Sequence, residues 1–244
     1  MFLFLRLLLA HFIGDFPLQF DAIFKFKQKG LKGCIPHALI IVACCLALSW
    51  PYLGNPLVLV FIGFIGVTHL IQDSIKLKYN TPKHSFWTYL MDQAFHAGTM
   101  ALLFLTPLKD LTPPETTNIF TELYNNDMLA VYLIILIFTT YNGFFMIRNF
   151  KLSFLDKPDR AGSFEKWYGM TERALIASSF LADSVLIYFL PGIVILRPVF
   201  FFLLKKQLKI RKDFLSSVDI MLSWGIAMLG GYILYLFQSS YPVY

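Results

Sequence analysis

The chain has 244 residues, a formal net charge of +6, a hydrophobic content of 57% and a mean hydropathy of +0.62. This composition excludes an ordinary soluble globular domain and predicts an all-α, polytopic transmembrane helical bundle. The positive charge requires no nucleic-acid partner, because basic loops beside an anionic membrane leaflet account for it and no nucleic-acid motif is present.

Apolar runs long enough to cross the hydrocarbon core, about 20 residues each, predict seven or eight spans. They lie near residues 2–20, 34–53, 55–75, 86–107, 127–147, 172–190, 193–208 and 214–238. The 193–208 run is either a span or a re-entrant hairpin arm, because Pro191-Gly192 breaks the helix before it and Pro198 lies inside it. The first run lacks a basic start and a cleavage site, so we expect a retained helix rather than a secretory signal. With no repeat or linker, residues 1–244 are predicted to form a single integral membrane domain.

The loops differ in charge, and this difference predicts the orientation of the chain. Lysine and arginine concentrate in residues 25–32, 76–83, 148–173 and 205–212, which an eight-span chain places on one side of the membrane. Since basic loops remain in the cytoplasm, we expect both termini to lie outside. The cysteines Cys34, Cys44 and Cys45 indicate neither a disulfide framework nor a cysteine-based zinc site.

Three predicted helices each carry a histidine and an aspartate four residues apart. The pairs are His11 and Asp15, His69 and Asp73, and Asp92 and His96. Residues at this spacing share one helix face. The order reverses in the third pair, whose helix runs in the opposite direction, so all three aspartates lie nearer the cytoplasm and all three histidines lie deeper. His37, at the start of its helix, is expected to join the same layer.

Ionisable groups inside a membrane are costly and usually mark function, although a single His/Asp pair can also be a structural hydrogen bond. Imidazole and carboxylate at this spacing are good ligands for zinc, manganese or iron. The candidate metal ligands are His11, Asp15, His37, His69, Asp73, Asp92 and His96. Seven ligands exceed the needs of one four-coordinate ion, so we expect two ions, or one ion and a catalytic carboxylate.

Further polar residues are candidates for supporting or catalytic roles. Asp92 or Glu172 is predicted to act as the general base. Other candidates are Gln19, Gln72 and Gln93 as hydrogen-bond donors near the ligands, and Arg160, Arg173 and Lys32 as contacts for a phosphate. Each of these could instead be a helix-contact residue or a solvated loop residue. Asp183 and Arg197, on either side of the Pro191-Gly192 turn, are expected to form a structural ion pair.

The motifs HFIGDFPLQ, HLIQD, DQAFH and YGMTERALI, with a lysine-rich loop before His37, together resemble the DUF3307 family of bacterial integral membrane proteins. The resemblance extends from residue 11 to about residue 224, and the segment LADSVLIYFLPGIVILRP departs from it. It implies a multi-pass protein of the bacterial inner membrane and points to the His/Asp layer, Gln19, Glu172 and Arg173 as pattern positions. It implies no reaction, because the family has no established activity.

The residues favour a membrane-embedded, metal-dependent hydrolase with its site in the cytoplasmic half of the bundle. Its substrate would be a lipid or polyprenyl-phosphate headgroup, and membrane lipid would be its partner. Two alternatives remain open: a transporter or channel for protons or a metal cation that uses the same layer, and a non-catalytic scaffold subunit. The sequence leaves the identity of the metal and the oligomeric state undetermined.

Overall fold

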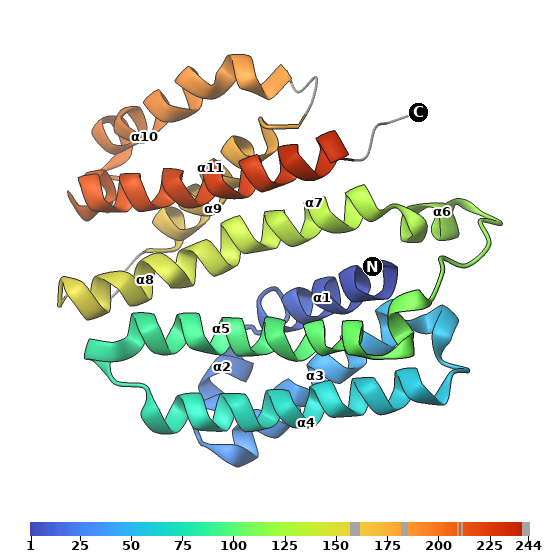
Figure 1. Ribbon diagram of the computed structural model, residues 1–244. Helices are drawn as coiled ribbons and strands as arrows, with labels where there is room; N and C mark the ends of the chain where they lie inside the picture. The colour runs from blue at the N-terminus through green and yellow to red at the C-terminus, as the bar shows by residue number, and fades with distance from the viewer. Residues whose placement is uncertain (157–161, 182–184, 209, 211, 241–244) are drawn as a thin grey trace. The chain divides into compact units, whose positions relative to one another are not determined.

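The computed structural model describes residues 1–156, 162–181, 185–208, 210 and 212–240. These residues form helices and turns with no β-strand among them, which confirms the all-α class. Contacts group the chain into two compact units, Met1–Ile134 and Ile135–Tyr244, and each is described by itself (Figure 1). The single integral domain stays a prediction.

The first unit is built around four longer helices. Its elements are α1 (Phe2–Asp15), α2 (Asp21–Lys27), α3 (Leu31–Leu48), α4 (Pro56–Tyr79), α5 (Ser85–Ala101), α6 (Ile119–Asn125) and most of α7 (Asp127–Ile137). Helix α4 begins where Asn55 accepts a hydrogen bond from the Leu57 backbone and Pro56 occupies the first turn. Both are favourable starts for a helix.

The second unit continues α7 through a π-helical turn. Its elements are the π-turn (Phe138–Asn142), α8 (Gly143–Phe154), α9 (Ser163–Ser178), α10 (Leu190–Leu204) and α11 (Ser217–Ser240). In the π-turn, the hydroxyl of Thr139 donates to the Ile135 carbonyl at 2.9 Å and that of Thr140 donates to the Leu136 carbonyl at 2.6 Å. Such turns leave backbone carbonyls available to other donors.

Within the part of the chain that the structure describes, five helical segments are long and apolar enough to cross a membrane, which indicates a membrane protein. They are Leu31–Leu48, Pro56–Tyr79, Asp127–Phe154, Ile187–Leu204 and Ser217–Ser240. The uncertain 193–208 run is therefore among them. Helices α1, α5 and α9, with 14, 17 and 16 residues, are shorter than the ~20 residues of a typical span. The predicted 172–190 run is wrong as a single helix, because α9 starts earlier and ends at Ser178.

Helix α1 is buried on nearly all sides, which explains its mainly apolar sequence. Leu3 and Leu7 pack in one core with Ile41 of α3 and Ile62 of α4. The guanidinium of Arg6, 2% exposed, hydrogen-bonds to the carboxylate of Asp127 and to the Tyr124 carbonyl. The charge of Arg6 is thus compensated within the first unit, as burial requires.

Two glycines shape the corner between α2 and α3. Gly30 adopts a φ of 85°, a conformation that L side chains rarely take. Gly33 lies so close to α2 that an added Cβ would be 1.9 Å from the Phe26 carbonyl oxygen. The corner therefore folds α2 tightly against α3 and turns Lys27, at the end of α2, into the protein.

We expect Gly33→Ala to destabilise the protein by about 1–3 kcal/mol, because backbone rather than a flexible side chain must move. The displacement should also expose the Lys27 amine. Thermal unfolding in detergent and amine-reactive labelling of Lys27 would measure both effects. Gly63→Ala is the matched helical control, since nothing lies within 4 Å of its Cβ. Equal stability of the two variants would contradict the close packing at this corner.

Candidate metal and polar site

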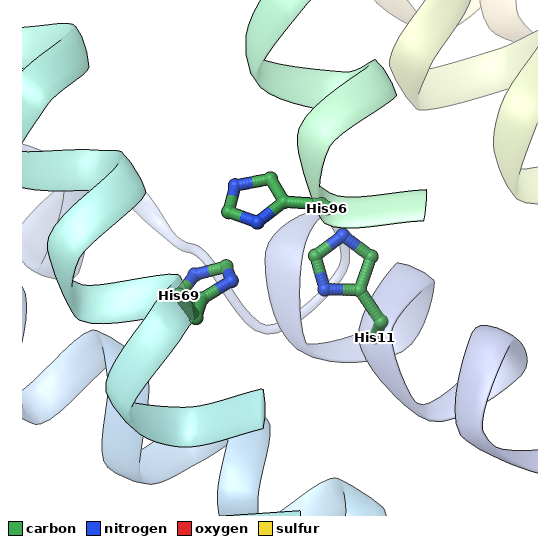
Figure 2. A group of neighbouring side chains, drawn as sticks. All are labelled: His11, His69 and His96. Atoms are coloured by element: carbon green, nitrogen blue, oxygen red, sulfur yellow. The ribbon is translucent and has the colours of Figure 1, made fainter. Parts of the chain in front are cut away.

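Four of the five histidines meet inside the first unit. His11 of α1, His37 of α3, His69 of α4 and His96 of α5 are each 2% exposed or less. The ring centroids of His69 and His96 are 4.2 Å apart, those of His11 and His96 are 4.9 Å apart, and those of His37 and His69 are 5.1 Å apart. Figure 2 shows three of the rings turned toward one another from three helices. The predicted convergence of the histidines is confirmed.

Several imidazole nitrogens in this cluster have no hydrogen bond to any described residue. They are Nδ1 of His11, Nδ1 of His37, both nitrogens of His69 and Nε2 of His96. Carboxylate oxygens of Asp73 and Asp92 lie 3.3 Å from Nε2 of His69 and His96, respectively. Buried polar atoms normally have partners, so the Nδ1 atoms of His11, His37 and His69, which have no hydrogen bond to a described residue, are unusual.

Three aspartates surround the imidazoles. Asp15 Oδ1 accepts a hydrogen bond from Nε2 of His37 at 3.0 Å, while its other oxygen is 4.0 Å from Nε2 of His11. Asp73 contacts His69, and its Oδ2 also lies 3.7 Å from Nε2 of His37. Each aspartate is thus close to the histidine of its own helix, as the four-residue spacing predicts.

The seven predicted ligands form three overlapping groups whose ligand atoms lie within 4.8 Å of one another. The groups are His11, His69 and His96; Asp15, His37 and His69; and Asp73, Asp92 and His96. All members are buried. Their role as metal ligands stays a prediction.

Two lysines that the sequence assigns to cytoplasmic loops belong to the cluster instead. Lys27 is 5% exposed, and its Nζ lies 2.7 Å from Asp73 Oδ1. The Nζ of Lys76, which lies within α4, donates to Asp92 Oδ2 at 2.6 Å. The prediction that both lie in loops is wrong, because Lys27 ends α2 and Lys76 lies within α4. Burial of the carboxylates favours a cation beside them. Together the lysines compensate two of the three carboxylate charges.

Two of the three predicted glutamines contact the cluster directly. With its amide oxygen toward α2, Gln19 accepts hydrogen bonds from Lys27 Nζ and His37 Nε2, each at 3.2 Å. Gln93 Nε2 donates to Asp15 at 3.3 Å and to Asp92 at 3.2 Å.

Gln72 lies at the edge of the cluster. Its amide donates to the hydroxyl of Thr99 at 2.9 Å, a residue of α5. This contact joins α4 to α5, which is the helix-contact role that the sequence allows.

The remaining candidates lie elsewhere. Glu172 and Arg173 belong to the second unit, Lys32 is exposed at the start of α3, and Arg160 and Asp183 lie outside the described residues. Among the described residues, Arg197 Nε donates to Glu172 Oε1 at 3.0 Å. Ser223 Oγ donates to the same carboxylate at 3.2 Å. The predicted pair of Arg197 with Asp183 falls on a residue outside the described part of the chain and stays a prediction.

Arg173 supports the π-turn of the second unit. Its Nε and Nη2 donate to the carbonyls of Thr139 and Thr140 at 2.6 and 2.9 Å, and Nη1 donates to Ser223 at 3.2 Å. Arg173 is 3% exposed. All three guanidinium nitrogens therefore have acceptors within the protein, and the arginine satisfies carbonyls that the π-turn leaves free.

A groove of about 420 Å³ opens on the first unit between α4 and α5. Its walls are mainly apolar and include Ile75, Met91 and Phe95, while Lys76 and Asp92 also line it. Asp92 therefore both contacts the histidine cluster and borders the groove. In the sequence, the apolar residues that line this groove look like ordinary lipid-facing residues of a membrane helix. The sequence therefore gives no separate signal for the groove.

Comparison with known proteins places this cluster in a family. Residues 3–124, half of the chain, match the family described as "Protein of unknown function (DUF3307)". The match contains every histidine and aspartate of the cluster and ends before the YGMTERALI motif. No curated protein and no solved structure matches the chain. The chain belongs to the DUF3307 family, whose function is not established.

Proposed function

We propose that this protein is a membrane-embedded, metal-dependent hydrolase whose His/Asp cluster binds one or two divalent transition-metal ions, zinc, manganese or iron. The observation that carries the proposal is the convergence of His11, His69 and His96, with Nδ1 of His11 and Nδ1 of His69 buried and without a hydrogen bond to any described residue. Three imidazoles flanked by carboxylates are a donor set that suits these ions.

The placement in the membrane is part of the proposal. The five candidate spans, together with the shorter α1, α5 and α9, give seven or eight crossings. Basic residues remaining in the loops then orient both termini outward, in a multi-pass protein of the bacterial inner membrane. The His/Asp cluster lies in the cytoplasmic half under this arrangement.

A divalent ion in the cluster would polarise a phosphoryl or carbonyl oxygen and make water a better nucleophile at neutral pH. Asp92 is the proposed general base, because it contacts His96 and also lines the groove through which a substrate would approach. Glu172 is less suited, since it belongs to the second unit and does not line this groove. The substrate would be a lipid or polyprenyl-phosphate headgroup.

The metal content of the purified protein tests the proposal. We expect a near-stoichiometric transition metal by elemental mass spectrometry, and its loss in His69→Ala and Asp92→Ala. The decrease in affinity should be at least about tenfold, since losing even a residue that only hydrogen-bonds a ligand costs about 10–100-fold. His84→Ala is the matched control, because His84 is exposed and belongs to none of the three ligand groups.

The outcome separates the metal centre from its alternatives. Wild-type protein that takes up neither zinc nor manganese would contradict the metallohydrolase. Metal binding without hydrolysis of phospholipid or polyprenyl phosphate would favour a scaffold or a metal-cation transporter.

One observation favours a proton relay as the second candidate function. A chain of polar contacts crosses the first unit through Lys27, Gln19, His37, Asp15, Gln93, Asp92 and Lys76. Chains of this kind conduct protons in membrane proteins. The apolar core around Leu3, Leu7 and Ile62 counts against a continuous path. Proton flux in proteoliposomes, abolished by His37→Ala, would support the relay.

A further inference from the structure

We propose that the groove between α4 and α5 binds one acyl chain of an anionic phospholipid and holds its phosphate on Lys76. This inference deepens the proposed function, on which it rests for the meaning of the site, by assigning where a lipid lies relative to the cluster. Binding itself requires neither metal nor turnover.

The apolar wall of the groove suits a hydrocarbon chain. Ile75, Met91 and Phe95 line it and are 52%, 53% and 62% exposed. Helix α4 is a candidate membrane span, so its exposed side faces lipid rather than water. An apolar groove on such a surface fills with the chains of the surrounding bilayer, and its concave shape holds one chain more fully than a flat helix face does.

Aromatic residues mark the end of the groove at which a headgroup would lie. Tyr79 is the last residue of α4 and Trp87 lies in the first turn of α5, and both line the groove. Tyrosine and tryptophan concentrate where hydrocarbon meets the headgroup layer. A lipid chain in the groove would therefore have its polar end near the α4–α5 turn.

Charge selects the headgroup. Lys76 lines the groove with its side chain 24% exposed, and its ammonium makes one hydrogen bond to a described carboxylate, that of Asp92. An ammonium carries three donors, so two remain for a phosphate oxygen. Lys78 and Lys83 follow in the same turn region and add positive charge. This arrangement favours an anionic phospholipid over a zwitterionic one.

The position of the phosphate relates the groove to the cluster. Asp92 contacts both Lys76 and His96, at 2.6 and 3.3 Å. Only the side chain of Asp92 would thus separate a phosphate on Lys76 from the imidazole of His96. The groove would present a lipid headgroup, rather than a soluble molecule, to the site.

Photolabelling in vesicles tests the inference. The full-length protein is reconstituted into phosphatidylcholine vesicles with phosphatidylglycerol that carries a photoactivatable acyl chain, and labelled peptides are mapped by mass spectrometry. We expect label on the groove walls of α4 and α5. Ile75→Trp and Met91→Trp should lower it about tenfold, since excluding even two methylene groups removes that much binding. Ile71→Trp is the matched control, because Ile71 is 51% exposed on α4 but does not line the groove.

Two comparisons test the headgroup preference. Unlabelled phosphatidylglycerol should compete about tenfold better than phosphatidylcholine in wild type, as expected from one charge-assisted contact. Lys76→Met should remove that preference while leaving chain labelling by phosphatidylcholine in place. The competition in wild type remains decisive if Lys76→Met does not fold.

Several results would overturn the inference. Label spread evenly over all exposed helix faces, or unchanged in Ile75→Trp, would show a general lipid layer. Equal competition by both phospholipids would exclude the role of Lys76, and competition by polyprenyl phosphate alone would identify another occupant. If the wild-type protein takes up no metal but its groove is still labelled, the metallohydrolase fails and the inference about the lipid is supported.

Discussion

Replacing Arg197 with methionine is expected to lower the free energy of unfolding by about 3–5 kcal/mol, because the Glu172 carboxylate would remain buried without its cation. The two side chains are 5% and 1% exposed, and two guanidinium nitrogens donate to the carboxylate. Among the described residues, only Ser223 would then hydrogen-bond to it. A single hydroxyl cannot compensate a buried negative charge.

Unfolding in detergent micelles, followed by heat or denaturant, measures this loss. Lys206→Met is the matched control, since Lys206 is exposed just after α10 and its removal should cost less than about 0.5 kcal/mol. The double variant Arg197→Met with Glu172→Gln should recover much of the stability, because it removes the unpaired charge. If Arg197→Met is as stable as Lys206→Met, the ion pair does not contribute to the stability of the second unit.

The local parts of the polar cluster could be predicted from the sequence. The four-residue spacing fixes which face His11 and Asp15 share, whatever the tertiary structure, and the same holds for the pairs on α4 and α5. Apolar runs likewise predict α3 and α4 closely, since their length and hydropathy are local properties. The reversal of order in DQAFH was enough to bring the histidines of opposite-running helices to one level.

The partners of the cluster could not be predicted, because they depend on turns between helices. Lys27 is buried because the tight corner at Gly30 and Gly33 folds α2 against α3. The position of a lysine between two apolar runs does not reveal such a corner. The predicted run 55–75 ends just before Lys76, but α4 continues to Tyr79 and keeps this lysine within the helix. Arg197 pairs with Glu172, a residue 25 positions away on another helix, and no local sequence pattern links the two.

Replacing Lys27 with methionine tests whether this lysine is an exposed loop residue or a buried partner of Asp73, because the two cases differ in the stability that the replacement costs. A solvated loop lysine contributes about 0–1 kcal/mol through surface pairing. In the structure, Lys27 Nζ is 2.7 Å from a carboxylate that is 1% exposed, and Gln19 accepts a second hydrogen bond from it. Its removal should therefore cost about 3–5 kcal/mol.

Unfolding measurements on Lys27→Met and Lys25→Met distinguish these values, because Lys25 lies on the same short helix but is exposed. Adding Asp73→Asn to Lys27→Met should restore part of the stability, since the asparagine needs no cation, and the coupling between the two changes reports their contact. If metal occupies the cluster, its positive charge would partly replace that of the lysine. The stability lost in Lys27→Met should then be smaller with zinc or manganese present than without it. The stability lost in Arg197→Met, a change in the second unit, should be the same with and without either ion.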